Sequence, residues 1–393
     1  MRIAIQRSTG YFLTFICLGM DMAVVGPTLP ALAGQTGSTL GAIGLVFLLS
    51  AGGATLGTLL GSWIFDKVSG RVVLAAAQIG SAVLMFLAPH VPWLYVLMVL
   101  FAVKGVAGGL VNTGANTLML WTHEEKAAPF VTALHFFFGL GAFISPFLLG
   151  LLLGAGGLYA DGYHLLAVFD LLVGVILLVF LRPPAPPQKK AEAGAAASSG
   201  RFVVPLALSA MLYLFFYVSA EITFGGWISS YAITLNLADA VRAAYLTSIF
   251  WLAFTIGRLI AIPAAVRFAP RRIIAVALAG CAGFLGLLVL FPEAPSAVWI
   301  AAAGAGFCMA PVWPSGYTLA GQSVKLTARL SGFILLGDSI GGMILPGLTG
   351  WIMEAAGAPA MTQLVLASLV ATFLAYLGIL YFGKRRKETG GAV

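Results

Sequence analysis

Charged residues are scarce in this chain of 393 residues, because Asp, Glu, Lys and Arg make up only 9% of it. A typical soluble domain has about 25% charged residues. Hydrophobic residues make up 61% of the chain, which excludes an ordinary water-soluble protein. The sequence also lacks a G-x-x-x-x-G-K-[ST] phosphate-binding loop, and its connecting segments are too short for an ATP-binding domain. An ATP-driven pump is therefore excluded.

Cysteine is also rare, and Cys17, Cys281 and Cys308 all lie in apolar runs. In such runs cysteine behaves as a small hydrophobic residue, so neither a disulfide nor a metal site is predicted. The segment GDSIG at 337–341 matches the hydrolase pattern G-x-S-x-G. That pattern requires a strand-to-helix turn, whereas this segment lies within an apolar run. We expect no enzymatic activity, no metal and no cofactor.

Long apolar segments are what the chain has in abundance. A membrane-spanning helix needs about 20 apolar residues. Twelve segments meet this requirement, at residues 10–34, 39–65, 71–90, 92–121, 127–154, 163–182, 203–233, 241–268, 271–291, 296–322, 328–356 and 359–383. The sequence therefore predicts an all-α membrane protein with twelve transmembrane helices that contact the lipid bilayer.

The positive charges predict the orientation of these helices. Of the 21 Lys and Arg residues, 18 fall at the termini or in even-numbered loops. The exceptions are Lys104 and Arg258 within spans and Arg242 in an odd-numbered loop. The positive-inside rule then places both termini in the cytoplasm, and we expect a multi-pass protein of the inner (plasma) membrane. Topology and anionic lipid explain the net charge of +8, so no nucleic-acid partner is expected.

The chain matches itself at an offset of 200 residues. Identical residues recur at this offset in the pairs Gly57/Gly257, Arg71/Arg271, Gly141/Gly341 and Pro146/Pro346. Because six is an even number, two six-helix copies enter the membrane in the same direction. We predict parallel six-helix bundles at 1–182 and 203–393, related by a pseudo-twofold axis along the membrane normal. Residues 183–202, rich in Pro, Ala, Ser and Lys, are predicted to form a cytoplasmic linker.

This architecture resembles the major facilitator superfamily over essentially the whole chain. The loop DKVSGR at 66–71 is similar to the superfamily signature between helices 2 and 3, with one extra residue. The resemblance marks its Asp66 and Arg71 as gating or structural charges. The segments FFYVSAEITFGGWISSYA, IGRLIAIPAAVRFAPRRI, NTGANTL and ALHFFFGLGAFISP resemble the fucose/galactose/glucose permease branch and the related sodium-dependent glucose transporters. The resemblance implies a monosaccharide carrier whose two bundles rock to alternate access to a midplane site.

Two carboxylates, Asp21 and Glu221, lie in helices 1 and 7 at equivalent positions of the repeat. A charge at the bilayer centre costs about 2.5–3.5 kcal/mol, so such residues are functional candidates. We predict that both couple a cation to transport, with the proton preferred over sodium. The alternative is that either acid pairs with Lys104 or Arg258. In the family resemblance Asp21 matches the coupling acid of helix 1, but the second acid, in helix 4, is replaced by Asn112.

The other charges within spans are predicted to have gating or structural roles. Lys104 precedes a glycine-rich face of helix 4, and it resembles the basic residue that many superfamily members carry there. Arg258 and Asp338 lie in helices 8 and 11, where a salt bridge between helices is the alternative to a substrate contact. Asp170 lies in helix 6, which the resemblance makes a peripheral helix, and we expect a structural role for it.

Substrate-binding candidates are amides and aromatic rings. Asn112 and Asn116 are spaced i, i+4, so they share one helix face and offer donors and acceptors for sugar hydroxyls. Hydrogen bonding between helices is the alternative. Trp313 and Tyr317 occupy the matching positions at an offset of 201 and present rings for the apolar face of a pyranose. His135 is a further candidate, with a packing role as the alternative.

Trp227 and Tyr231 are also spaced i, i+4, directly after the pair Gly225–Gly226. We predict that the glycines let helix 7 bend and that the aromatic side closes over the substrate. The alternative is that these rings anchor the helix at the membrane interface.

Together these features predict a cation-coupled symporter of a monosaccharide or a similar small polar solute, acting as a monomer. An exporter of amphipathic drugs or lipids is the alternative, with Phe136, Phe137 and Phe138 lining an apolar cavity. A membrane receptor is a third possibility, but the twofold repeat with acids at equivalent positions has no evident use in it.

Overall fold

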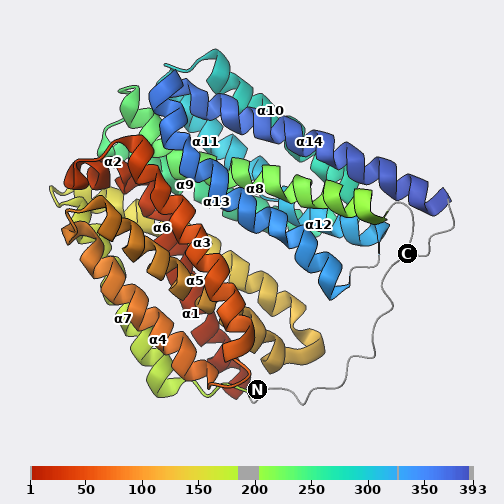
Figure 1. The fold of residues 1–393 in the computed structure, drawn as a ribbon, viewed down its shortest axis with the longest axis horizontal. Coiled ribbons are helices and arrows are strands. Elements are labelled where there is room, and N and C mark those ends of the chain that lie inside the picture. The colour runs from red at the N-terminus through yellow and green to blue at the C-terminus, as the bar shows by residue number, and fades with distance from the viewer. Residues whose placement is uncertain (1, 185–202, 325–326, 389–393) are drawn as a thin grey trace. The chain divides into compact units, whose positions relative to one another are not determined.

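A computed structural model describes residues 2–184, 203–324 and 327–388 (Figure 1). Of the predicted linker only residues 183–184 are among them. Within the described residues every regular element is a helix. The helices are α1 (Arg2–Ala23), α2 (Val25–Thr36), α3 (Leu40–Ile64), α4 (Gly70–Leu87), η1 (Ala88–His90), α5 (Leu94–His123), η2 (Glu124–Lys126), α6 (Ala128–Gly154), α7 (Tyr159–Phe180), α8 (Val203–Thr234), α9 (Ala240–Arg267), α10 (Pro270–Leu290), α11 (Pro295–Met309), α12 (Val312–Ser323), α13 (Ala328–Ala356) and α14 (Pro359–Glu388).

The number of membrane spans agrees with the prediction. Eleven helical segments of the described chain are each long and apolar enough to cross a membrane. The bent pair formed by α1 and α2 passes the same test and supplies the twelfth. The prediction of an all-α protein with twelve transmembrane helices is therefore confirmed.

Prolines set the two breaks within spans. The ring of a proline clashes with the carbonyl group four residues earlier and removes one helical hydrogen bond. Pro27 acts in this way on Ala23, where α1 ends before a bend of 49°. Pro314 acts on Ala310, which lies between α11 and α12. At Gly225–Gly226 α8 continues without a break, and the predicted bend at these glycines stays a prediction.

The described chain divides into two compact units. The first holds α1 to α7 together with Gly226–Leu252, and the second holds the remaining described helices and parts of helices. In the first unit α3 packs along α5, α1 along α6 and α4 along α7. In the second unit α10 packs against α11, α12 and α14.

The repeat in the sequence reappears as a repeat in packing. A Cβ atom on Gly141 of α6 would lie 2.0 Å from the carbonyl oxygen of Ile16 on α1. A Cβ atom on Gly341 of α13 would lie 2.2 Å from the carbonyl oxygen of Phe215 on α8. Only glycine allows such close approach of two helix backbones. These two glycines match at the offset of 200 because each marks the same helix crossing in its own unit.

Helix α7 shows how one face is assigned to lipid and the other to protein. Its exposed residues share one side of the helix, at the positions Val168, Leu171, Leu172, Val175 and Val179. Its buried side includes Asp170, which is 1% exposed. An apolar outer face suits hydrocarbon, so the charge of Asp170 is directed into the unit.

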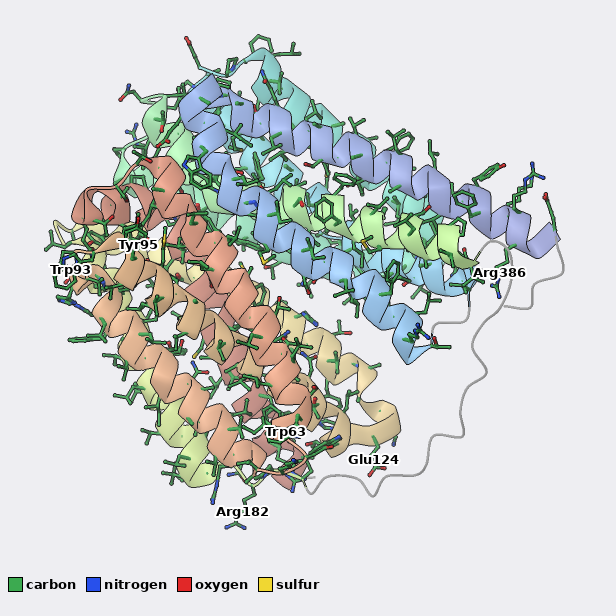
Figure 2. All side chains as sticks on the ribbon, viewed as in Figure 1. Trp63, Trp93, Tyr95, Glu124, Arg182 and Arg386 are labelled. Carbon is green, nitrogen blue, oxygen red and sulfur yellow. The ribbon has the colours of Figure 1, made fainter. Side chains whose placement is uncertain are left out.

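Exposed aromatic residues lie at both ends of the first unit (Figure 2). Trp93 and Tyr95 precede or begin α5 at one end, and Trp63 lies near the end of α3 at the other. The ammonium group of Lys67 lies 3.8 Å from the centre of the Trp63 ring. Arg182 lies at the same end as Trp63 (Figure 2). Aromatic belts of this kind mark the two interfaces of a membrane.

Candidate functional site

Asp21, on the buried side of α1, forms a buried ion pair in the first unit. Its Oδ2 atom lies 3.1 Å from Nζ of Lys104 on α5. The hydroxyl of Ser81, on α4, donates a hydrogen bond of 2.9 Å to the same oxygen. The two side chains of the pair are only 4% and 7% exposed. This pairing with Lys104 is the alternative to cation coupling that the sequence left open for Asp21, and a coupling role for Asp21 stays a prediction.

A second carboxylate, Asp170 of α7, lies next to this pair. The amide nitrogen of Gln78 donates a hydrogen bond of 2.6 Å to its Oδ1 atom. Asp170 is close enough to Asp21 and Lys104 for the charges to interact, and Cys17 lies beside it. We call Asp21, Gln78, Ser81, Lys104 and Asp170 the ionic cluster.

Helix periodicity explains how α1 and α4 bring these side chains together. Cys17 and Asp21 are four residues apart on α1, and Gln78 and Ser81 are three residues apart on α4. Residues at these spacings share a helix face. Cys17 and Gln78 therefore lie toward Asp170, whereas Ser81 contacts Asp21, which pairs with Lys104.

A small cavity adjoins the ionic cluster. Asp21, Gln78 and Ser81 form its polar wall, and Leu18, Ala107 and Val111 form part of its apolar wall. Its volume is about 10 Å³, which is close to the least that can hold one water molecule. The cavity thus has room for a single small occupant and not for a sugar.

The aromatic pair Trp313 and Tyr317 lies on α12 of the second unit. The two rings are stacked with their centres 5.6 Å apart and their planes at 15°. The indole nitrogen of Trp313 donates a hydrogen bond of 2.8 Å to Oδ1 of Asp338 on α13. Both rings are partly exposed. Asp338 therefore fixes the orientation of one ring in an accessible aromatic surface.

Glu221, on α8, is 8% exposed and belongs to the second unit. Tyr217, Arg258 and Asp338 are near enough to interact with its carboxylate. The guanidinium of Arg258 also lies 4.5 Å from the centre of the Phe254 ring. Glu221 and Asp21 occupy equivalent positions of the repeat. Their basic neighbours do not, because Lys104 lies on α5 and Arg258 on α9, which are not equivalent helices of the repeat.

The two asparagines of α5 are joined to each other. The side-chain nitrogen of Asn116 donates hydrogen bonds to the backbone oxygen of Asn112, at 2.9 Å, and to its side-chain oxygen, at 3.2 Å. Both side chains are partly exposed. His135 of α6 is exposed, and its ring is edge-on to that of Phe15 with centres 5.8 Å apart. All three remain predicted substrate-binding residues.

The other predicted residues differ in exposure. Trp227 and Tyr231 are fully buried, and the ring of Trp227 lies 5.9 Å from that of Phe47. Asp66 is exposed in the loop between α3 and α4, whereas Nε of Arg71 is buried without a hydrogen-bond partner. A gating role for this loop stays a prediction.

Sequence reasoning missed Gln78 and Ser81 and expected only a structural role for Asp170. A signal was present, because Gln78 is the single amide in the predicted span 71–90. A polar side chain in an apolar span normally has a partner inside the protein. Its partner, Asp170, could not be identified from the sequence, because that requires knowing how α7 is rotated about its axis.

Comparisons with known proteins agree with this architecture. A family model for the Major Facilitator Superfamily matches residues 11–336 and 242–392. The chain is 32% identical over 372 residues to Sodium-dependent glucose transporter 1A of Mus musculus, covering 86% of this chain and 88% of that protein. It is 30% identical to Sodium-dependent glucose transporter 1 of Homo sapiens, covering 86% of this chain and 71% of that protein.

Solved structures match the whole fold. A D-xylose-proton symporter superposes with a TM-score of 0.78 at 15% identity, covering 97% of each chain. A nucleoside transporter superposes with a TM-score of 0.72 at 13% identity, covering 97% of this chain and 99% of that one. At such low identity these matches establish the fold alone. With the family match and the sequence relatives, they identify the chain as a multi-pass membrane transporter that belongs to the Major Facilitator Superfamily.

Proposed function

We propose that this chain is a cation-coupled symporter of a monosaccharide or a similar small polar solute, working by alternating access. The observation that carries the proposal is the ionic cluster, in which Asp21 and Lys104 form a buried ion pair beside Asp170. Charges inside a membrane are costly and are usually retained for a function. Coupling to a transported cation gives this cluster such a function.

The names of related proteins support the substrate class. The mouse and human relatives are named sodium-dependent glucose transporters, and a structure of the same fold is that of a D-xylose-proton symporter. The sequence favours a proton as the coupling cation, whereas the names of the relatives favour sodium. Both cations must therefore be tested.

We assign Trp313 and Tyr317 to sugar binding, because their stacked and partly exposed rings suit the apolar face of a pyranose. Asp338 holds the Trp313 ring in place. Asn112 and Asn116 are assigned to the sugar hydroxyls, since each amide has both a donor and an acceptor.

Uptake of radiolabelled hexose into proteoliposomes tests the proposal. We expect accumulation when an inward gradient of sodium or protons is imposed, and only equilibration without a gradient. If neither gradient changes uptake, the coupling is refuted. Gradient-driven efflux of an amphipathic dye without sugar uptake would instead favour the exporter.

The variant Glu221→Gln tests the second predicted coupling residue. We expect it to abolish gradient-driven accumulation while the protein is still made and folded. Glu293→Gln, in the exposed turn between α10 and α11, is the matched control and should transport normally. Unchanged accumulation in Glu221→Gln would assign Glu221 a structural role.

A further inference from the structure

Three buried oxygen atoms of the ionic cluster have no hydrogen-bond partner in the structure. They are Oδ1 of Asp21, Oε1 of Gln78 and Oδ2 of Asp170. The three residues are 3%, 2% and 1% exposed. Buried polar atoms without a partner are uncommon in native proteins, and each one requires an explanation.

All three atoms accept hydrogen bonds and cannot donate them when both acids are ionised. The nitrogen and hydroxyl donors bind the opposite oxygen of each carboxylate, and the Cys17 thiol is a weak further donor beside Asp170. Lys104 and Ser81 both contact Oδ2 of Asp21, and the Gln78 nitrogen contacts Oδ1 of Asp170. The orientation of the Gln78 amide follows from this contact, because its nitrogen must face the carboxylate. The cluster thus combines satisfied donors with unused oxygen atoms.

Charge and size restrict what can use these oxygens. When both acids are ionised, the two carboxylates and one ammonium group leave one negative charge, which a monovalent cation neutralises and a divalent cation exceeds. Asp21 and Gln78 both line the cavity of about 10 Å³, whereas Asp170 is not among its lining residues and accepts a hydrogen bond from Gln78. Oxygen ligands of this kind suit hard cations. Among the described residues no group of three or more His, Cys, Asp or Glu could hold a metal ion, so a zinc-type site is not indicated.

We propose that Asp21, Gln78 and Asp170 form a sodium site inside the first unit. Asp21 and Gln78 supply ligand oxygens at the cavity, and Asp170 supplies the second negative charge beside them. The hydroxyl oxygen of Ser81 keeps lone pairs free while it donates to Asp21. On this proposal the bound cation is sodium, whereas the sequence favours a proton. That this ion drives sugar transport rests on the proposed function, whereas its binding does not.

Thermal unfolding of the purified full chain in detergent tests the site, because a ligand that binds the folded state raises the apparent stability. Sodium chloride is compared with choline, potassium and lithium chloride at equal ionic strength. We expect a saturable rise in unfolding temperature with sodium that choline and potassium do not reproduce.

Two variants assign this effect to the cluster. Gln78→Met removes a ligand oxygen without changing any charge, and Asp170→Asn removes one negative charge. We expect each to raise the sodium concentration for half-maximal stabilisation at least tenfold. Asp161→Asn, at the exposed start of the same helix α7, should leave this concentration unchanged. Gln78→Met keeps the test decisive if Asp170→Asn does not fold.

The outcomes separate this site from the proposed function. Equal stabilisation by sodium and choline, or an unchanged sodium response in both variants, overturns the site. If the unfolding temperature depends on pH but not on sodium, the sodium site is overturned and proton binding is favoured instead. If the variants lose sodium binding but wild-type hexose uptake ignores sodium, the site stands and the coupling fails. If uptake depends on sodium while the variants respond like wild type, the coupling stands and the site fails.

Discussion

Removing Lys104 should destabilise the protein more than removing its partner Asp21. Lys104→Met leaves two buried carboxylates, Asp21 and Asp170, without a cation. Asp21→Asn leaves Lys104 with Asp170 still close enough for their charges to interact. The double variant leaves one buried carboxylate and no ammonium group, so we expect its stability to lie between those of the single variants.

The structure gives the magnitude of the effect. At the 3.1 Å separation of Lys104 Nζ and Asp21 Oδ2, an effective dielectric constant of about 20 gives a gross attraction of about 5 kcal/mol. Desolvation offsets part of it, and breaking a buried pair from one side costs about 3–5 kcal/mol. We expect a loss of this size for Lys104→Met and of about 1–2 kcal/mol for Asp21→Asn, where a neutral amide replaces the carboxylate.

Equilibrium unfolding in mixed detergent micelles, followed by the fluorescence of the eight tryptophans, measures these differences. The use of sodium-free buffer keeps sodium binding from contributing to the measured free energies of unfolding. Arg242 and Asp239 form an exposed pair, with Nε and Oδ2 3.9 Å apart, and serve as the control. Its variants Arg242→Met and Asp239→Asn should change stability by less than about 1 kcal/mol. A loss for Asp21→Asn as large as that for Lys104→Met, or losses that simply add in the double variant, would rule out this account of the ion pair.

Two further predictions concern helix packing and the aromatic pair. Gly141→Ala should destabilise the protein by roughly 1–3 kcal/mol, because its Cβ atom would lie 2.0 Å from the Ile16 carbonyl oxygen. A Cβ atom on Gly80 would meet no other atom within 4 Å, so Gly80→Ala should stabilise α4 by up to about 1 kcal/mol. Thermal unfolding of both variants checks that the two changes in stability have opposite signs. Asp338→Leu should weaken sugar binding about tenfold by releasing the Trp313 ring, whereas Asp338→Asn keeps an acceptor and should bind nearly normally. Tryptophan fluorescence titrated with sugar measures this, and equal affinities of the two variants would contradict it.

The helices could be predicted closely because burial in lipid leaves a strong mark on the sequence. The predicted span 328–356 coincides with α13 (Ala328–Ala356), since hydrocarbon requires an uninterrupted apolar run of sufficient length. The repeat could also be predicted, because a helix crossing that tolerates only glycine keeps that residue in both copies. Gly141 and Gly341 are such a pair.

The site was only partly predictable. The cost of a charge in the membrane singled out Asp21, but hydropathy does not reveal the rotation of a helix that is apolar on most sides. The contact between Gln78 on α4 and Asp170 on α7 depends on that rotation in both helices. The helix breaks could not be predicted for another reason. The glycine pair at 225–226 permits a break but α8 continues through it, and Pro27 lies just after a break whereas Pro146 and Pro346 lie inside continuous helices.

The separation of Asp21 and Lys104 along the chain affects how the protein enters the membrane. Lys104 follows Asp21 by 83 residues, which at roughly 5–20 residues per second takes the ribosome about 4–17 s. During this interval α1 has emerged with its carboxylate but without the ammonium group that later neutralises it. Insertion of the first two spans, formed by α1 with α2 and by α3, is therefore least favourable before α5 is synthesised. A chaperone or insertase that shelters α1 during these seconds would act on this protein more than on one whose opposite charges lie in adjacent spans.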